Sequence, residues 1–277
     1  MGLRIATNIS SMTANRILSH SSEDQNKAYQ RLASGQRITQ AGDDAAGLSI
    51  SENLRAQIRS MSQAERNAND GISFAQVAEG GLTEINNIAI RLRELAIQAG
   101  SDTIGDRERG FIHQEVKSLV QEVDRIANVT NFNGTSLLNG QAPKGQLEFQ
   151  VGIRNDSSDR IVFDANSIDV RADRLGIDGL DYTSVDGARN ALEKVDSAAS
   201  QILSSRASLG AIQNKLQSTV RNLGVSKENL TIARSRIADT DIAADTSELV
   251  RGNILQSAGI SVLAQANSSP TQALKLL

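Results

Sequence analysis

Apolar residues recur every seven positions through the last third of the chain. The ladder has eight apolar members: Ala188, Val195, Ile202, Leu209, Leu216, Leu223, Leu230 and Ile237. At the chain's overall hydrophobic share of 39%, about three of eight would be apolar by chance, so the spacing predicts a sustained coiled-coil seam. A companion ladder mixes apolar and polar residues: Leu192, Ala199, Arg206, Gln213, Val220, Lys227 and Arg234. We therefore expect one long helix over 184–237, with its second seam partly open.

Two further helices are predicted earlier in the chain. Apolar residues step by three and four at Leu54, Ile58, Met61, Ala68, Ile72 and Ala75, and again at Leu82, Ile85, Ala89, Leu92, Ala96 and Ala99. Gly71 and Gly80-Gly81 lie inside this segment, but packing can offset the cost of about 1 kcal/mol per helical glycine, so we expect a continuous or gently bent helix. Gly100 is typical of a helix stop, and Gly105 closes the loop. A third helix carries one apolar face: Ile112, Val116, Leu119, Val123 and Ile126.

The hydrophobic period changes to two between these helices. Leu147, Phe149, Val151 and Ile153 alternate with polar residues, residues 155–158 have turn chemistry, and apolar residues resume over 161–163. This pattern predicts a β-hairpin at about 146–165. Residues 168–182 are rich in Asp and Gly and indicate an irregular return to the last helix. The predicted fold class is mainly α, a long antiparallel helical bundle with a β-hairpin.

The two ends of the chain have helical spacing but few charges. From position 243 onward there are ten large aliphatic side chains, whose full burial would contribute roughly 15–30 kcal/mol. Ordering the same 35 residues costs roughly 35–70 kcal/mol. We therefore expect both ends to be disordered in the monomer and to become helical on assembly. The residues expected to drive assembly are Ile5, Ile9, Met12, Val250, Ile254, Leu255, Val262 and Leu263.

The difference between the two chain ends and the regularly patterned middle of the chain predicts two domains. Residues 1–43 and 238–277 would form a terminal coiled-coil domain from the paired end helices. Residues 44–237 would form the helical bundle with its hairpin.

Composition excludes several classes of protein. The chain has no Cys, which excludes disulfides, thiolate metal sites and thiol nucleophiles. Its net charge of −3 is spread along the chain, so no basic stripe predicts nucleic-acid binding. The amino end lacks the apolar core of a secretory signal, and no apolar run is long enough to span a membrane. We expect neither a nucleic-acid partner nor a membrane partner.

Residues that could be catalytic or could bind a metal or phosphate have simpler structural explanations. His20 and His113 belong to no cluster with metal-ligand spacing. Asp43-Asp44 precedes Ala45-Ala46 and fits a helix cap better than an acid/base pair. Gly80-Gly81 is not followed by a phosphate-loop lysine, and GxSxG and GxGxxG elements are absent. We expect no enzyme activity, cofactor or metal. Serines in the turn at 156–159 could carry O-glycans, or turn chemistry alone could explain them.

Five segments, in chain order, carry a resemblance to a known family. They are LASGQRITQAGDDAAGLSIS (32–51), QAERNANDGISFAQVAEGGLTEIN (63–86), RLRELAIQA (91–99), NFNGTSLLNG (131–140) and SRIADTDIAADTSELVRGNILQSAGISVLAQAN (235–267). In these segments, which span nearly the whole length, the chain resembles bacterial flagellin. Only about 20 residues separate the hairpin from the last long helix, so the resemblance is to a minimal flagellin without variable outer domains.

The resemblance implies a structural subunit that self-polymerises into the extracellular flagellar filament used for swimming. It implies pairing of the two terminal helices as a coiled coil in the filament, and export through the flagellar type III apparatus without a cleaved signal peptide. Implied partners are sister copies, the filament cap, hook-associated junction proteins and an export chaperone that binds 249–277.

The resemblance also implies a surface for a Toll-like innate receptor, which would be a subunit interface in the filament. The matching positions are Arg91, Leu95 and Glu115. Ile90 departs from the family's receptor-binding pattern, which has Gln there.

Two alternatives stay open from the sequence alone. A hook–filament junction protein or minor flagellin paralogue would share the terminal segments. A cytoplasmic signalling coil, such as a chemoreceptor rod, would show similar heptads. Electron microscopy of the purified protein under precipitating salt separates them, because a flagellin forms long filaments and a signalling coil forms none.

Overall fold

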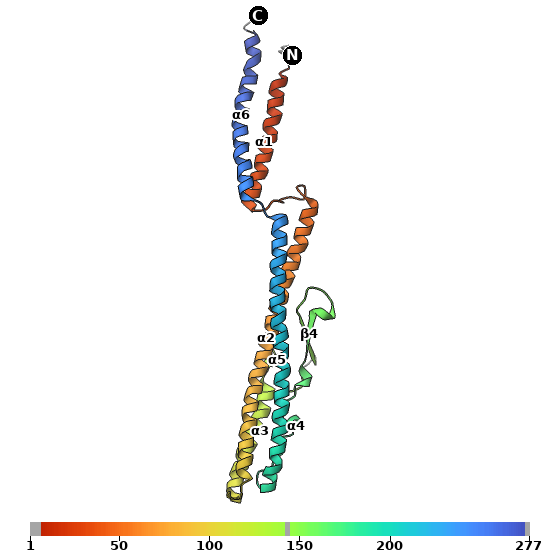
Figure 1. Cartoon of the computed structure of the whole chain (residues 1–277), viewed down its shortest axis with the longest axis vertical. Helices are drawn as coiled ribbons and strands as arrows, with labels where there is room; N and C mark the ends of the chain where they lie inside the picture. Colours follow the sequence, from red (N-terminus) through yellow and green to blue (C-terminus); the bar gives the residue numbers. More distant parts are fainter. Residues whose placement is uncertain (1–6, 142–144, 275–277) are drawn as a thin grey trace. The chain divides into compact units, whose positions relative to one another are not determined.

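The computed structural model of the chain describes residues 7–141 and 145–274, with side chains described as far as Ser268. Its α-helices are α1 (Ile9–Ser34), α2 (Ala45–Ala99), α3 (Asp106–Val129), α4 (Ala172–Leu175), α5 (Val185–Ala238) and α6 (Ile242–Leu274). Its strands are β1 (Asn131–Phe132), β2 (Thr135–Ser136), β3 (Gln146–Gln150) and β4 (Arg160–Asp164). The predicted mainly α fold with a β-hairpin is confirmed (Figure 1).

The chain forms two compact units. One comprises residues 1–58 and 228–277, and the other comprises residues 59–227. The second unit contains α3, the strands, α4 and the greater part of α2 and α5. The predicted domain boundaries at 43 and 238 lie near breaks between helices, and they stay a prediction.

Helix α2 runs unbroken through its internal glycines, as its apolar spacing predicts. The two adjacent glycines differ in their surroundings. A Cβ at Gly80 would meet nothing within 4 Å, whereas a Cβ at Gly81 would lie 2.7 Å from Leu138 Cδ1 and 2.9 Å from Thr130 Oγ1. Gly81 therefore allows the loop after α3 to approach the helix closely. The helix ends at Ala99 and α3 begins after Gly105, also as predicted.

The two ladders of α5 have the burial that their composition predicts. Six members of the apolar ladder, from Ala188 to Leu223, are buried. The mixed ladder is half-buried throughout. Three of its four polar members pair with α2: Gln213 Nε2 donates to Glu79 at 3.0 Å, Arg206 Nη2 lies 3.7 Å from Glu79, and Lys227 Nζ lies 2.5 Å from Glu65. Pairing lets a partly open seam retain charged groups.

The predicted hairpin is confirmed as an antiparallel pair of β3 and β4, with Gln146 opposite Asp164 and Gln150 opposite Arg160. Phe163 packs edge-on against Phe74 of α2, with the ring centroids 5.1 Å apart. A second, smaller hairpin joins β1 and β2. It turns at Asn133 and Gly134, which both have positive φ and fit the tight turn that Asn-Gly favours.

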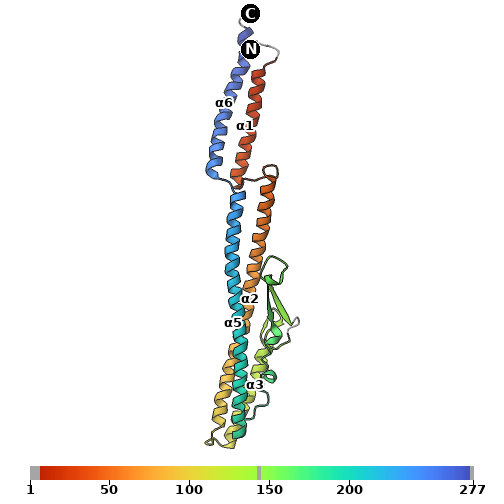
Figure 2. The ribbon, with the colours of Figure 1, turned by 45° about the vertical axis from the view of Figure 1, so that its right-hand side comes forward.

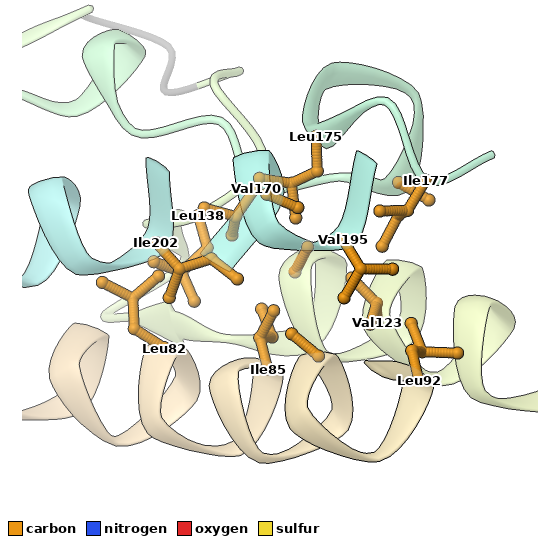
Figure 3. Close-up of a cluster of buried hydrophobic side chains, with 14 of the residues drawn as sticks. Leu82, Ile85, Leu92, Val123, Leu138, Val170, Leu175, Ile177, Val195 and Ile202 are labelled. Atoms are coloured by element: carbon orange, nitrogen blue, oxygen red, sulfur yellow. The ribbon is translucent and has the colours of Figure 1, made fainter. Parts of the chain in front are cut away.

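The return segment 168–182 is irregular, as expected, but it is also part of the core. Its buried side chains are Ile168, Val170, Ala172, Leu175, Ile177, Leu180 and Tyr182. Figure 3 shows Val170, Leu175 and Ile177 lying over residues of α5, with α2 and α3 residues completing the cluster. The Tyr182 hydroxyl donates a hydrogen bond of 3.1 Å to the Leu92 carbonyl of α2. The segment therefore adds a set of buried apolar side chains to the core formed by α2, α3 and α5.

Candidate functional site: the paired terminal helices

Helices α1 and α6 lie side by side and run antiparallel (Figures 1 and 2). Near the chain ends, Asn8 Nδ2 donates to the Ala266 carbonyl at 2.8 Å. Further along, a Cβ at Gly259 would lie 3.2 Å from Leu18 Cδ1. Gln25 packs beside Gly252, and its side-chain amide donates to the Asn253 side chain. Contacts therefore run along most of α1.

The seam between the two helices has a heptad pattern. The seam residues of α1 are Ser11, Ala14, Leu18, Ser21, Gln25, Ala28 and Leu32, and those of α6 are Leu249, Gly252, Gln256, Gly259, Leu263 and Ala266. Steps of three and four on both helices are the spacing of a two-stranded coiled coil. Most of these side chains are small or polar. Gln25 and Ala28 are the buried residues of α1, so the pair has almost no apolar core of its own.

Apart from four half-buried leucines on the seam, most large apolar side chains of the two helices lie outside it. Exposed fractions are 62% for Ile9, 66% for Met12, 64% for Ile254 and 58% for Val262. Exposed apolar surface on this scale marks an interaction site, because its burial against a partner is favourable.

The structure places most of the predicted assembly residues on this outer surface. Ile9, Met12, Val250, Ile254, Leu255 and Val262 are exposed. Leu263 is half-buried on the seam instead. Ile5 lies outside the described residues. Ile17 and Ile260 are equally exposed but absent from the predicted set, although both are large aliphatics within the same helices.

Both terminal segments are helices in the structure, which differs from the expectation that they are disordered in the monomer. The shortage of buried side chains in the pair is the physical basis of that expectation. Disorder in an isolated molecule in solution stays a prediction.

The greater part of α6 is uncharged. Residues 252–274 contain no Asp, Glu, Lys or Arg. Charged residues gather elsewhere on the pair, where Arg16, Asp24, Glu248 and Arg251 line a groove of about 460 Å³ between α1 and α6. An uncharged surface can be buried against other copies without the desolvation cost of ions.

The predicted receptor surface is only partly exposed. Arg91 donates from Nη2 to Glu115 Oε1 at 2.9 Å and from Nη1 to Glu94 at 3.1 Å. The hydrogen bond to Glu115, then that to Glu94, raises the pKa of the Arg91 guanidinium. Leu95 does not lie on this surface: it is 1% exposed because it belongs to the apolar face of α2 that packs in the bundle core. Ile90, beside Arg91, is exposed.

The Asp43-Asp44 pair has the structural role predicted for it. Asp44 caps α2 by accepting from the Gly47 N–H at 2.8 Å. Asp43 Oδ2 holds the preceding turn, accepting from the Thr39 hydroxyl at 2.9 Å and from the Thr39 and Gln40 amides. These hydrogen bonds, with the Thr39 hydroxyl first, lower the pKa of Asp43. The two carboxylates are therefore occupied by backbone and turn contacts.

The two histidines lie apart from any metal-type cluster in the described ranges. His20 Nδ1 lies 3.6 Å from Asp24 on the exposed face of α1. His113 is half-buried on α3. Across 7–141 and 145–274, no group of three or more His, Asp or Glu side chains could hold a metal ion.

A helical bundle joined to a helix pair that leaves its large apolar side chains exposed defines a structural subunit of the self-assembling class. Two family models match the chain: the bacterial flagellin N-terminal helical region over residues 5–142, and the bacterial flagellin C-terminal helical region over residues 192–277. This chain belongs to the bacterial flagellin family.

The sequence similarity to individual relatives extends over nearly the whole length of each relative. The chain is 41% identical over 270 residues to a flagellin of Halalkalibacterium halodurans, covering 98% of each chain. It is 42% identical over 308 residues to a flagellin of Bacillus subtilis, covering 99% of this chain and all of the relative. Among solved structures, Bacillus cereus flagellin has a TM-score of 0.51 and 30% identity, covering 57% of this chain and 88% of that one.

Membership of this family establishes the general function. The protein is a structural subunit that polymerises with its own copies into the extracellular flagellar filament, which serves swimming motility. It is not an enzyme, because flagellins are structural proteins. The resemblance to a minimal flagellin is confirmed, and the signalling-coil alternative is wrong. No helix in the described part of the chain has the length and apolarity to cross a membrane.

Proposed function

We propose that the α1–α6 pair is the surface through which copies of this chain assemble. Ile9, Met12, Val250, Ile254, Leu255 and Val262 would pack against sister copies, joined by Leu263 and Ile5. One observation carries the proposal: large aliphatic side chains are exposed on a helix pair that has almost no apolar core. Each such side chain contributes about 1.5–3 kcal/mol when fully buried. Polymerisation would supply that burial.

We also propose the domain division that the sequence predicts. Residues 1–43 and 238–277 would form the terminal coiled-coil domain of the filament, and 44–237 the surrounding bundle. Support comes from the helix breaks: α1 ends at Ser34 before α2 begins at Ala45, and α5 ends at Ala238 before α6 begins at Ile242.

Removal of residues 254–277 tests the proposal. We expect a soluble bundle that no longer polymerises, because the truncation removes much of the exposed aliphatic surface of α6 and leaves the bundle core untouched. Electron microscopy and pelleting under precipitating salt measure polymerisation, and circular dichroism checks that the bundle is folded. Continued filament growth by the truncated chain would contradict the proposal.

The apolar surface of α6 also supports a role before assembly. An export chaperone would cover residues 249–277 and prevent premature polymerisation, and the flagellar type III apparatus would export the chain. The filament cap and hook-associated junction proteins would meet the same helices at the two ends of the filament. Family membership and the exposure of Val250, Ile254 and Leu255 support the proposal of these partners.

A second proposed surface binds a Toll-like innate receptor through Arg91 and Glu115, with Glu94 and Ile90 beside them. Support comes from the exposed ion pair between α2 and α3. Replacing Arg91 with alanine is expected to weaken capture of the purified monomer by the receptor ectodomain. Arg93→Ala is the matched control, because Arg93 pairs instead with Asp196 of α5. Equal capture of both variants and the parent chain, or no capture of the parent chain, would contradict the proposal.

A further inference from the structure

The chain contains two Asn-Gly pairs, Asn133-Gly134 and Asn139-Gly140. In such a pair the glycine nitrogen can attack the asparagine side chain, because glycine has no Cβ to crowd that nitrogen. Asparagine is among the thermolabile residues of proteins. Both pairs have the same local chemistry, so a difference in their reactivity comes from their surroundings in the fold.

The first pair is open. It forms the exposed turn between β1 and β2. A Cβ at Gly134 would meet nothing within 4 Å, so the space beside the attacking nitrogen is free. Across the described ranges the Asn133 side chain has no hydrogen-bond partner. Ring closure requires rotation about the Asn133 backbone, and a hairpin whose strands have two residues each opens locally at low cost.

The second pair is buried and held. Asn139 is 7% exposed, and its Oδ1 accepts from the Gln141 N–H at 3.0 Å. Its backbone forms an antiparallel bridge with Asp169. A Cβ at Gly140 would lie 2.9 Å from the Asp169 side chain, so the nitrogen is crowded. Leu138, immediately before the pair, is fully buried. Rotation of this segment would therefore expose part of the core.

We propose that Asn133 is a self-modification site, at which the asparagine converts spontaneously to aspartate and isoaspartate, and that the fold protects Asn139 from the same reaction. The modified position lies in the bundle unit, outside the helix pair assigned to assembly. The inference therefore goes beyond the proposed function and does not depend on it.

The conversion needs only water. The Gly134 nitrogen forms a bond to Asn133 Cγ and gives up its proton, while the Cγ–Nδ2 bond breaks and the side-chain nitrogen takes up a proton and leaves as ammonia. The product is a cyclic imide. Water then adds to one of the two imide carbonyl carbons. Cleavage at Cγ restores the main chain with aspartate at position 133, and cleavage at the main-chain carbonyl leaves an isoaspartyl linkage.

Both products change the surface beside the turn. Asn133 lines a groove of about 550 Å³ whose lining also includes Asp70 and Glu148. A carboxylate at position 133 would therefore gather like charge there. The isoaspartyl product also lengthens the main chain by a methylene group within a tight turn, so the register that sets Phe132 opposite Thr135 would be lost.

Peptide mapping of the purified monomer tests the proposal. Trypsin cuts after Arg125 and Lys144, so one peptide carries both pairs. After incubation at mildly alkaline pH, conversion at Asn133 is expected to be roughly tenfold faster or more than at Asn139, the ratio that about 1.4 kcal/mol of opening free energy gives. In concentrated urea the two rates should become similar. Equal rates in the folded chain, no conversion at Asn133, or a difference that persists in urea would overturn the proposal.

Asn133→Gln gives an independent readout on the intact chain. The parent monomer should develop an acidic species on ion-exchange chromatography, because a neutral amide becomes a carboxylate, and Asn133→Asp marks its elution position. Asn133→Gln should not develop this species over the same period, because the longer side chain would have to close a larger ring.

Asn131→Gln is the matched control. Asn131 is also exposed in the β1–β2 hairpin, but the bulky Phe132 follows it instead of glycine. This variant should develop the acidic species at the parent rate. An acidic species that persists unchanged in Asn133→Gln, or that Asn131→Gln abolishes, would overturn the assignment of the modification to Asn133.

Discussion

Replacing Ile254 with aspartate is expected to abolish polymerisation while leaving the monomer folded. The side chain is 64% exposed on α6 and lies in the stretch 252–274 that carries no charge. In the monomer the new carboxylate stays in water, and an exposed substitution of this kind changes stability by about 0.5 kcal/mol or less. In the polymer the proposed contact would bury an unpaired carboxylate, whose desolvation costs several kcal/mol per copy. Because every added copy bears this cost, growth should stop.

Ile254→Leu is the matched control for this experiment. It conserves the volume and apolar character of the side chain, so filaments should still form. Pelleting and electron microscopy under precipitating salt measure growth, and circular dichroism at the same temperature compares the folded monomers. Filaments from the aspartate variant in parent-like yield would place Ile254 outside the assembly interface.

Replacing Tyr182 with alanine is expected to destabilise the bundle by about 3–5 kcal/mol, the usual cost of truncating a buried aromatic residue. The ring is fully buried, and its hydroxyl bonds to the Leu92 carbonyl of α2. Truncation leaves a cavity where the return segment crosses the bundle. Urea unfolding followed by far-ultraviolet circular dichroism measures the loss.

Tyr182→Phe separates the ring from the hydroxyl. It keeps the packing and removes one hydrogen bond, so its cost should be about 1 kcal/mol. A cost for Tyr182→Ala no greater than that for Tyr182→Phe would contradict the burial of the ring.

Tyr182 is also expected to make the stability of the bundle depend on pH. Burial raises the pKa of Tyr182 to about 12, above the ordinary value of about 10 that applies in the unfolded chain. The unfolded state therefore loses this proton first as pH rises. The contribution of Tyr182 to stability is complete below about pH 10 and is lost progressively towards pH 12. Tyr182→Phe should lack this component, and an identical alkaline decline in both proteins would contradict it.

The helices illustrate how much of the fold local pattern can predict. A helical face that packs against a core repeats every three to four residues, so the bounds of α2, α3 and α5 follow closely from the spacing of their apolar residues. The same period could have placed Leu95 correctly, because it lies on the apolar face with Leu92 and Ala96. The family resemblance instead suggested a surface position.

In the terminal helices, the apolar spacing does not predict which side chains lie on the seam. Their exposed aliphatics were predicted as assembly residues because the segments lack enough apolar surface to form a core alone. The sequence did not separate Leu263 on the seam from Val262 outside it. That choice depends on the register of α1 against α6, which is a long-range property.

By itself, the sequence determined the long helices, the hairpin, the loop bounded by Gly100 and Gly105, and the family, because each of these follows from local spacing or from contiguous motifs. Only the tertiary structure decided that the aperiodic segment ending at Tyr182 is core, and that Leu263 lies on the α1–α6 seam while Val262 lies outside it. The physical reason is the same for both. The burial of Tyr182 against α2 and the register of α6 against α1 depend on segments distant in the chain, and no local period records where such segments meet.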